Sequence, residues 1–252
     1  MKYQVYLDSR SSSGPRPSTA VFQLNQTIIN AIQVKVLSFT FANTLFNVVS
    51  PFNTLVFSGG FTITVTPGFY DFADFINGIN TQMLANAAFV TALGGNPNGI
   101  TLGAQNNAIW TLGTNVLLGG GLYNTFLLQA GNYTSNFTTT IFLAAPQAIA
   151  LTSPALQGAQ RFAVTYGVPI STPFFVQHIE SGFGDMEPSN SAIELGWKVE
   201  LSHNNIGEIT VLLTDPQNSR ELTELSMWSI LLEITSGELN SSFFLKKKIN
   251  KQ

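Results

Sequence analysis

The segment HIESGFGDME gathers four side chains that can bind a metal ion or transfer a proton: His178, Glu180, Asp185 and Glu187. Carboxylate oxygens of this kind can hold Ca²⁺. Their order along the chain matches neither an EF-hand loop nor the ligand spacing of a zinc site. We therefore expect a solvated loop here, with a calcium site as the less favoured alternative, and we predict no resident metal and no cofactor.

Nucleophilic catalysis has few possible bases in this chain, because its only histidines are His178 and His203. No G-x-S-x-G motif is present, and the Gly-rich segment at 117–122 lacks the Lys and Ser/Thr of a phosphate loop, so we expect a turn there. The absence of cysteine excludes disulfides and thiol chemistry. An enzyme would need His178 and Glu180 to converge with a nucleophile. We predict that the protein is not an enzyme.

A basic tail, residues 236–252, closes the chain. A run of lysines can bind nucleic acid or an anionic membrane surface through phosphate contacts, although it is more often a solvated terminus. The net charge of −3 gives no global attraction to nucleic acid, so any polyanion contact would be local. Phe243 and Phe244 can dock the tail against a neighbour. The candidate assembly or polyanion contacts are Lys246, Lys247, Lys248 and Lys251.

The middle of the chain is almost free of charge. Between Phe75 and Gln160 there is no Asp, Glu, Lys, Arg or His, and extending back to Val36 adds only Asp71 and Asp74. Acid/base catalysis, metal binding and phosphate handling all need such groups. No run approaches the roughly 20 apolar residues of a transmembrane helix, so we predict no transmembrane segment. A surface of Asn, Thr, Ser, Gln and Gly is cheaper to desolvate than a charged one, as subunits packed in an assembly require.

Short apolar runs separated by turn residues predict a β-sandwich or barrel. Tyr3 to Leu7 is expected to form a strand, which is followed by a flexible Ser/Pro arm within residues 1–20. The run FTITV at 61–65 alternates with the period of a half-buried strand. In AIQVKVLSFTF the apolar phase shifts at Val36-Leu37, which indicates a β-bulge or a strand buried on both faces. EITVLLT and SMWSILLEI are interpreted as two antiparallel strands joined by a loop.

One short amphipathic helix is predicted near residues 71–90, after the turn Pro67-Gly68. Asp71 is its expected N-cap, and Asp74 would lie in the first turn, where the helix dipole favours a negative charge. We expect its apolar stripe to pack against the sandwich; binding to a partner is the alternative. The stripe consists of Phe72, Phe75, Ile76, Ile79 and Met83.

The block from Ile28 to Val48, followed by FTITVTPGFYDFADFINGIN, resembles the N-terminal signature of the penton or minor capsid proteins of virophages, polinton-like viruses and nucleocytoplasmic large DNA viruses. AIALTSPAL and the last two apolar runs are also similar to strands of that family. The resemblance covers roughly residues 21–235, and the region 95–145 matches poorly. The signature residues in this sequence are Ser38, Phe39, Asn43, Thr44, Asn47, Pro67, Gly68 and Tyr70.

The resemblance implies an all-β fold with a single jelly-roll sandwich of two antiparallel sheets over residues 21–235, in which region 95–145 adds loops or an inserted subdomain. It implies a capsid protein of the virion, assembled in the host cell. We expect the penton, a homopentamer at icosahedral vertices beside the major capsid protein. Another minor capsid role remains open, and the tail could contact nucleic acid or the inner capsid. The alternative is a receptor- or carbohydrate-binding β-sandwich, such as a fibre head or lectin-like module.

Overall fold

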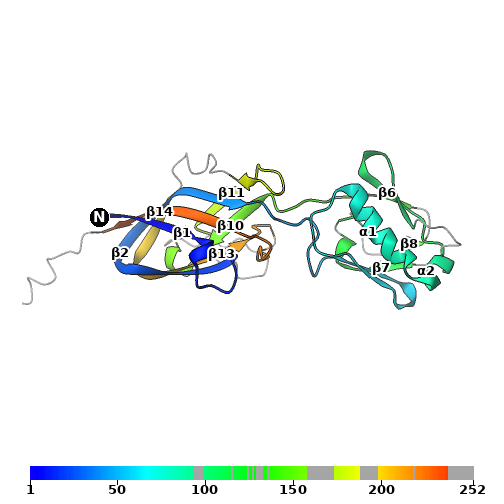
Figure 1. Cartoon of the computed structure of the whole chain (residues 1–252), viewed down its shortest axis with the longest axis horizontal. Helices are drawn as coiled ribbons and strands as arrows, with labels where there is room; N and C mark the ends of the chain where they lie inside the picture. The colour runs from blue at the N-terminus through cyan, green and yellow to red at the C-terminus, as the bar shows by residue number, and fades with distance from the viewer. Residues whose placement is uncertain are drawn as a thin grey trace, which may run out of the picture. The chain divides into compact units, whose positions relative to one another are not determined.

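The computed structural model of the chain is built from antiparallel sheets and few helices, which confirms the predicted all-β class (Figure 1). It divides into two compact units. Unit 1 comprises Met1–Thr44 and Pro146–Gln252, and unit 2 comprises Leu45–Ala145. Unit 2 ends where the expected insertion at 95–145 ends, but it begins much earlier. The structure describes residues 1–92, 99–114, 116–123, 125–126, 128, 133–134, 137–157, 173–187, 198–217 and 219–237.

Unit 1 contains one seven-stranded sheet with the order β1-β14-β2-β13-β10-β11, in which β12 also pairs with β2. Every pair in it is antiparallel. Short 3-10 turns follow β1 at Ser9–Ser11 and β10 at Pro154–Leu156. The strands are β1 (Lys2–Asp8), β2 (Thr19–Ala42), β10 (Ala148–Thr152), β11 (Phe175–His178), β12 (Met186–Glu187), β13 (Lys198–Thr214) and β14 (Trp228–Ser236).

The long strand β2 joins two apolar runs that the sequence pattern separates. Asn30, with φ of 56°, interrupts its regular geometry. The predicted β-bulge is confirmed, because Leu231 pairs with Ser38 while Leu232 pairs with Val36, which leaves Leu37 as the extra residue. A bulge of this kind reverses which alternate side chains face the core. The buried positions accordingly change from Val34 and Val36 before the bulge to Phe39 and Phe41 after it.

The interpretation of β13 and β14 as paired antiparallel strands is wrong. Both pair antiparallel with β2, on its two opposite edges, so they run in the same direction with β2 between them. Strands that run in the same direction need a crossover of about a dozen residues or more. The connection from Asp215 to Met227 provides such a length, whereas a hairpin turn would not. The apolar pattern therefore predicts both strands correctly, but each strand pairs with β2 and not with the other.

Residues 8–19, expected to be a flexible arm, instead make specific contacts with the sheet. The carbonyl oxygen of Pro17 accepts a hydrogen bond from the indole Nε1 of Trp228 at 2.6 Å. The Oγ of Ser9 accepts one from the Trp228 backbone N–H at 2.9 Å. Ser18 is fully buried, and its carbonyl oxygen accepts from Leu213 at 2.9 Å. Ser9 and Ser18 can be buried here because the hydroxyl of each forms a hydrogen bond within the fold.

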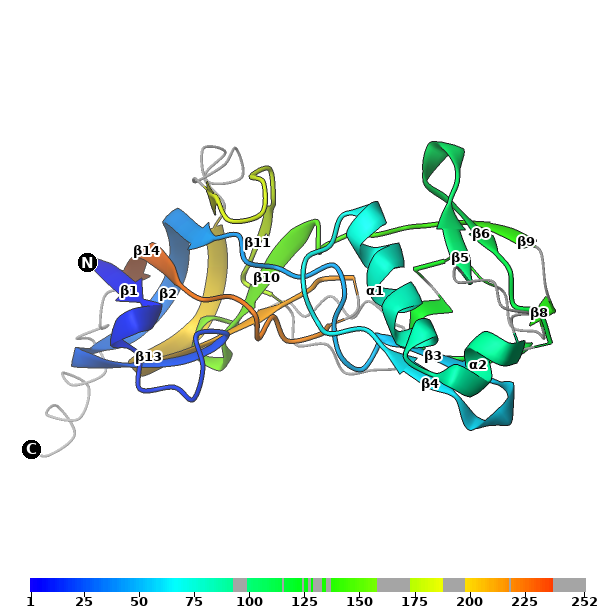
Figure 2. The ribbon, with the colours of Figure 1, turned by 45° about the vertical axis from the view of Figure 1, so that its right-hand side comes forward.

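Unit 2 has its own core between two small sheets and two helices (Figure 2). One sheet has the order β4-β3-β7-β8 and the other the order β5-β6-β9. The elements are β3 (Thr54–Phe57), β4 (Thr62–Thr64), α1 (Phe72–Leu84), α2 (Ala87–Ala92), β5 (Ile100–Leu102), β6 (Asn107–Trp110), β7 (Val116–Gly119), β8 (Tyr133–Thr134) and β9 (Phe137–Thr140).

The predicted helix is present but broken in two. Asp71 caps α1 as expected, because its carboxylate accepts a hydrogen bond from the Asp74 backbone N–H at 2.8 Å. The helix ends at Leu84 instead of continuing to residue 90. The side chain of Asn86 then accepts from the Phe89 N–H at 3.1 Å, which caps the new helix α2. An Asn that bonds local backbone in this way starts a helix better than it continues one.

The Gly-rich segment at 117–122 ends β7 and enters a short 3-10 turn at Gly121–Tyr123. Gly120 has φ of 119°, and a Cβ built on it would lie 2.2 Å from the carbonyl oxygen of Thr54. Only glycine fits such a close approach of two backbones. The glycines of this segment therefore have a packing role beside β3.

Candidate functional site

The loop HIESGFGDME, between β11 and β12, is held by one of its own carboxylates. Glu187 is only 1% exposed, and its Oε2 accepts hydrogen bonds from the backbone N–H groups of Glu180 at 3.0 Å and Ser181 at 2.6 Å. His178, Glu180 and Asp185 are exposed. The expected solvated loop is therefore accurate for these three side chains and wrong for Glu187. In the described part of the chain, no three His, Asp or Glu residues are grouped to hold a metal.

The signature residues at the end of β2 fix the chain where it leaves unit 1. The Asn43 Nδ2 donates to the carbonyl oxygen of Ser181 at 2.9 Å, and its backbone N–H donates to that of Asp185 at 2.8 Å. The Oγ1 of Thr44 donates to the carbonyl oxygen of Glu224 at 2.8 Å. Two loops from distant parts of the sequence are thus tied to the last residues before unit 2.

A second signature pair fixes the chain within unit 2. The Asn47 side chain forms two hydrogen bonds with the backbone of Tyr70: its Nδ2 donates to the carbonyl oxygen at 2.8 Å, and its Oδ1 accepts from the N–H at 3.0 Å. Val48 and Gly68 form an antiparallel bridge beside this pair. The signature therefore marks backbone anchors, and its polar side chains bond backbone groups in place of a ligand.

The stripe of α1 faces the core of unit 2. Phe75, Ile76, Ile79 and Met83 are buried there, and Phe72 is partly buried against the same cluster. Phe75 lies 5.4 Å, centroid to centroid, from Phe126, whose ring meets that of Trp110 edge-on at 4.6 Å. This packing favours a structural role for the stripe over partner binding.

Two amide side chains of α1, which no sequence motif distinguishes, connect the helix to both sheets of unit 2. Asn80 bonds the backbone of Ile100 in β5, with its Nδ2 donating at 2.5 Å and its Oδ1 accepting at 3.0 Å. Gln82 bonds the backbone of Thr64 in β4 in the same manner, at 2.6 and 3.0 Å. Each side-chain amide donates one hydrogen bond and accepts one, as the backbone of a neighbouring strand would.

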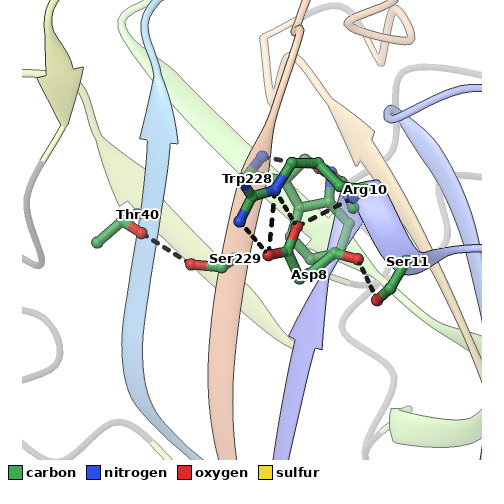
Figure 3. Close-up of polar contacts among 7 residues, drawn as sticks. Asp8, Arg10, Ser11, Thr40, Trp228 and Ser229 are labelled. Atoms are coloured by element: carbon green, nitrogen blue, oxygen red, sulfur yellow. Dashed lines mark hydrogen bonds and ion pairs between the residues drawn. The ribbon is translucent and has the colours of Figure 1, made fainter.

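A charged cluster follows β1 in unit 1 (Figure 3). The carboxylate of Asp8 accepts hydrogen bonds from the guanidinium of Arg10, the shortest at 2.6 Å. The hydrogen bond from Arg10 holds the pKa of Asp8 below its usual value, and the same contact raises the pKa of Arg10. Ser11 donates to the Asp8 carbonyl oxygen at 2.8 Å, and Thr40 shares a hydrogen bond with Ser229 nearby. The Asp8 carboxylate is therefore paired with a guanidinium from its own segment.

Glu221 is a second acid with a shifted pKa. Burial alone would raise the pKa of Glu221, but hydrogen bonds from Ser18 at 2.6 Å and Thr19 at 2.7 Å outweigh burial, so the pKa lies below its usual value. Close by in sequence, Arg220 and Glu224 form a largely buried ion pair at 2.8 Å. The Glu221 carboxylate thus joins the start of β2 to the connection before β14, whereas the Arg220–Glu224 pair lies within that connection.

The surface of unit 2 combines few charges with exposed apolar side chains. Its only ionisable acids are Asp71 and Asp74, and it contains no Lys, Arg or His. Trp110, by contrast, is fully buried in unit 2, as Trp228 is in unit 1, so neither offers a platform for sugar. Trp197 lies outside the described residues. Among the described residues of unit 2, the exposed large apolar side chains are Phe52, Phe69, Leu84, Leu102, Ile109, Leu118 and Phe142.

The lysines proposed as polyanion contacts, Lys246, Lys247, Lys248 and Lys251, lie outside the described residues, as does the side chain of His203. Among the described helices, none is long and apolar enough to cross a membrane.

Solved structures that are similar to this chain include the following two. The mavirus penton protein is 9% identical, with a TM-score of 0.49 over 94% of this chain and 99% of that chain. A chain from the cryo-EM structure of the Sputnik virophage is 11% identical, with a TM-score of 0.42 over 92% of this chain and 98% of that chain. No family model matches, and no curated protein matches.

Proposed function

We propose that the protein is a structural protein of a viral capsid, namely the penton that forms pentamers at icosahedral vertices, and that it has no catalytic activity. The observation that carries this proposal is the surface of unit 2, which lacks cations, has two acids and exposes Phe52, Phe69 and Phe142 among other apolar side chains. A surface that carries few charges and exposes large apolar side chains is one that another protein can cover. The sequence signature from Ile28 to Tyr70, which resembles that of viral penton proteins, supports the same role.

Assembly into a ring would bury part of this surface between subunits. In a closed ring each subunit contributes two different faces, both of which leave water when the ring closes. Stable interfaces bury about 1,200–2,000 Å² in total. Neutral amides and hydroxyls lose less on leaving water than charges do, so a surface built from them can be covered on several sides at modest cost. In the virion, which assembles in the host cell, the remaining faces would contact the major capsid protein.

The basic tail has a separate proposed role at the inner face of the capsid. Lys246, Lys247, Lys248 and Lys251 would each contact phosphate or an acidic inner surface. Binding of the purified protein to DNA should then weaken steeply with salt, with a log-log slope of roughly −0.9 for each phosphate neutralised. Replacing the four lysines with alanine should flatten that slope, and an unchanged slope would show that the tail does not bind DNA.

The oligomeric state tests the proposal directly. Light scattering of the purified chain at high protein concentration should give the mass of a pentamer. Trimers would instead favour the fibre-head alternative, because virus fibre heads are usually trimers. Replacement of the exposed Phe52, Phe69 and Phe142 by serine should weaken pentamers while leaving each subunit folded, since these side chains lie outside the core of unit 2.

A further inference from the structure

A groove of about 390 Å³ lies beside β1 and the first part of β2 in unit 1. Residues from Tyr3 to Leu7 and from Phe22 to Gln26 line it, together with Ser11 and Ile28. This volume falls at the lower end of the range of about 300–1,000 Å³ that small-molecule sites occupy. Every lining residue is uncharged, so the groove suits a short, neutral ligand.

The buried part of the lining is apolar. Leu7, Phe22 and Ile28 are buried, and Val5 and Leu24 are half-buried. Ligand sites commonly combine an apolar base of this kind with a few polar groups that fix the orientation of the ligand. The polar groups here are the amides, hydroxyls and phenols of the remaining lining residues.

Four amide side chains line the groove, and three of them are unused. Gln23 donates a hydrogen bond to Glu208. Gln4, Asn25 and Gln26 are exposed, and their side chains form no hydrogen bond with another described residue. The two amides of α1, by contrast, use both their donor and their acceptor on backbone groups of unit 2. The groove therefore offers three free donors and acceptors to a ligand.

An exposed aromatic ring accompanies these amides. Tyr6 is 62% exposed and lies two residues after Gln4 in β1, so both side chains project from the same face of the strand. A tyrosine ring has an apolar body and a polar hydroxyl. The C–H face of a sugar ring packs on such an aromatic surface, and its neighbouring hydroxyls both donate and accept hydrogen bonds, as free amides do.

We propose that this groove binds a neutral oligosaccharide, with the Tyr6 ring against a sugar face and the amides of Gln4, Asn25 and Gln26 on its hydroxyls. An anionic ligand finds no free cation in the lining. A lipid chain would take the three amides out of water without partners, which is unfavourable. A neutral sugar uses all of these groups.

The competing occupant is an extended peptide. Among the described residues, β14 pairs with β2 only as far back as Ala31, so the same edge of β2 from Phe22 to Ile28 has no strand beside it. An open strand edge can accept another strand. Strand addition relies on backbone groups, however, and gives no role to the exposed Tyr6 ring or to the free amides, which is why the sugar is favoured.

This inference is independent of the proposed capsid role. The groove lies within unit 1 of a single molecule and consists of described residues, so sugar binding requires neither a pentamer nor the tail. A monomeric chain that binds sugar, or a pentameric chain that does not, would separate the two proposals.

Binding of the purified full chain to immobilised glycans tests the proposal. The probes are short neutral oligosaccharides of glucose, galactose, mannose or N-acetylglucosamine, and the same core sugars carrying sialic acid or sulfate. At least one neutral series should bind saturably, and added negative charge should not increase the affinity. Binding of anionic glycans alone would overturn the proposal. Absence of neutral sugar binding at millimolar concentration would also overturn it and would favour strand addition.

Substitutions then locate the site. Tyr6→Ala should weaken sugar binding by about tenfold, whereas Tyr6→Phe, which keeps the ring, should retain most of the affinity. Gln26→Ala should also weaken binding, and Asn77→Ala, at an exposed amide of unit 2, is its matched control. Because these side chains are exposed, the melting temperature should not change. Unaltered affinity in both Tyr6→Ala and Gln26→Ala would show that the sugar binds elsewhere and would refute the assignment of the groove.

Discussion

Units 1 and 2 of this chain are stabilised by different kinds of interaction. Unit 1 uses long antiparallel ladders around β2 and contains all the ion pairs found among the described residues, including Arg220–Glu224. Unit 2 has no cation and so can form no ion pair. It relies on an aromatic core and on amide side chains that bond backbone groups, as Asn80 and Gln82 do. A sequence with only two charged residues can therefore form a stable fold without ion pairs, and its surface remains inexpensive to desolvate.

The comparison predicts that removing a core aromatic from α1 affects unit 2 far more than unit 1. Phe75 is fully buried, and truncation of a buried Phe costs about 3–5 kcal/mol. Phe75→Ala should therefore unfold or strongly loosen unit 2, whereas Leu84→Ala, at an exposed position of the same helix, should have little effect. Hydrogen exchange read by mass spectrometry follows the two units separately. Equal loss of protection in both units would show that they unfold as one.

The next largest effect should come from the amide bonds of unit 2. Asn80 is buried and satisfies both backbone groups of Ile100, so Asn80→Ala leaves a buried donor and acceptor unpaired at a cost of about 1–3 kcal/mol. Asn77→Ala, at an exposed position of α1, is the matched control. Urea unfolding of the two variants measures the difference. If both variants unfold at the same urea concentration, the amide bonds do not stabilise unit 2.

Acidification should lower the stability of unit 1 more than that of unit 2. Folding lowers the pKa of Asp8 and Glu221 in unit 1. A carboxyl of this kind stabilises the folded state above its unfolded pKa of about 4, and that contribution is lost as the pH falls through the lower folded value. Melting curves between neutral pH and pH ~3 should show unit 1 losing stability on acidification.

Glu221→Gln provides the control for this effect. It should lower the stability of unit 1 at neutral pH and make that stability less dependent on pH, because the titrating group has been removed. Unit 2 should change less over the same range, since Asp71 and Asp74 are its only acids. A steeper acid dependence in unit 2 than in unit 1 would contradict this interpretation.

The smallest expected change is a gain in unit 2. A Cβ added to Gly78, inside α1, would meet no atom within 4 Å. Gly78→Ala should therefore stabilise the helix by about 0.5–1 kcal/mol. Gly120→Ala is the opposite case, because its Cβ would collide with the backbone of Thr54. Gly78→Ala should therefore melt at a higher temperature than Gly120→Ala. The reverse order would contradict the backbone packing described at these two positions.

Local features of this fold were predictable from sequence because local patterns determine them. The period of two gave β4, the period of three to four gave α1, and the change of phase at Leu37 gave the bulge in β2. The partners of β13 and β14 were not predictable, because pairing across β2 depends on residues far apart in the chain. The start of unit 2 was missed because the strands on either side of Leu45 have the same apolar pattern.

The polar residues were harder to interpret than the apolar ones. Glu187 occurs among exposed acids in the sequence, and nothing in that pattern distinguishes it from Glu180, yet only Glu187 is buried on the backbone of its own loop. Asn80 and Gln82 likewise look like surface residues until α1 is placed against two sheets. A polar side chain that bonds distant backbone carries no local signal, so its role appears only in three dimensions.

The mass of the native assembly tests the central claim most directly. The proposed role predicts that the purified chain forms rings of five in light scattering or native mass spectrometry, and that serine at Phe52, Phe69 and Phe142 on the sparsely charged unit 2 shifts the mass towards the monomer. A chain that remains monomeric at high concentration, or one that forms only trimers, would contradict the proposal of a vertex penton.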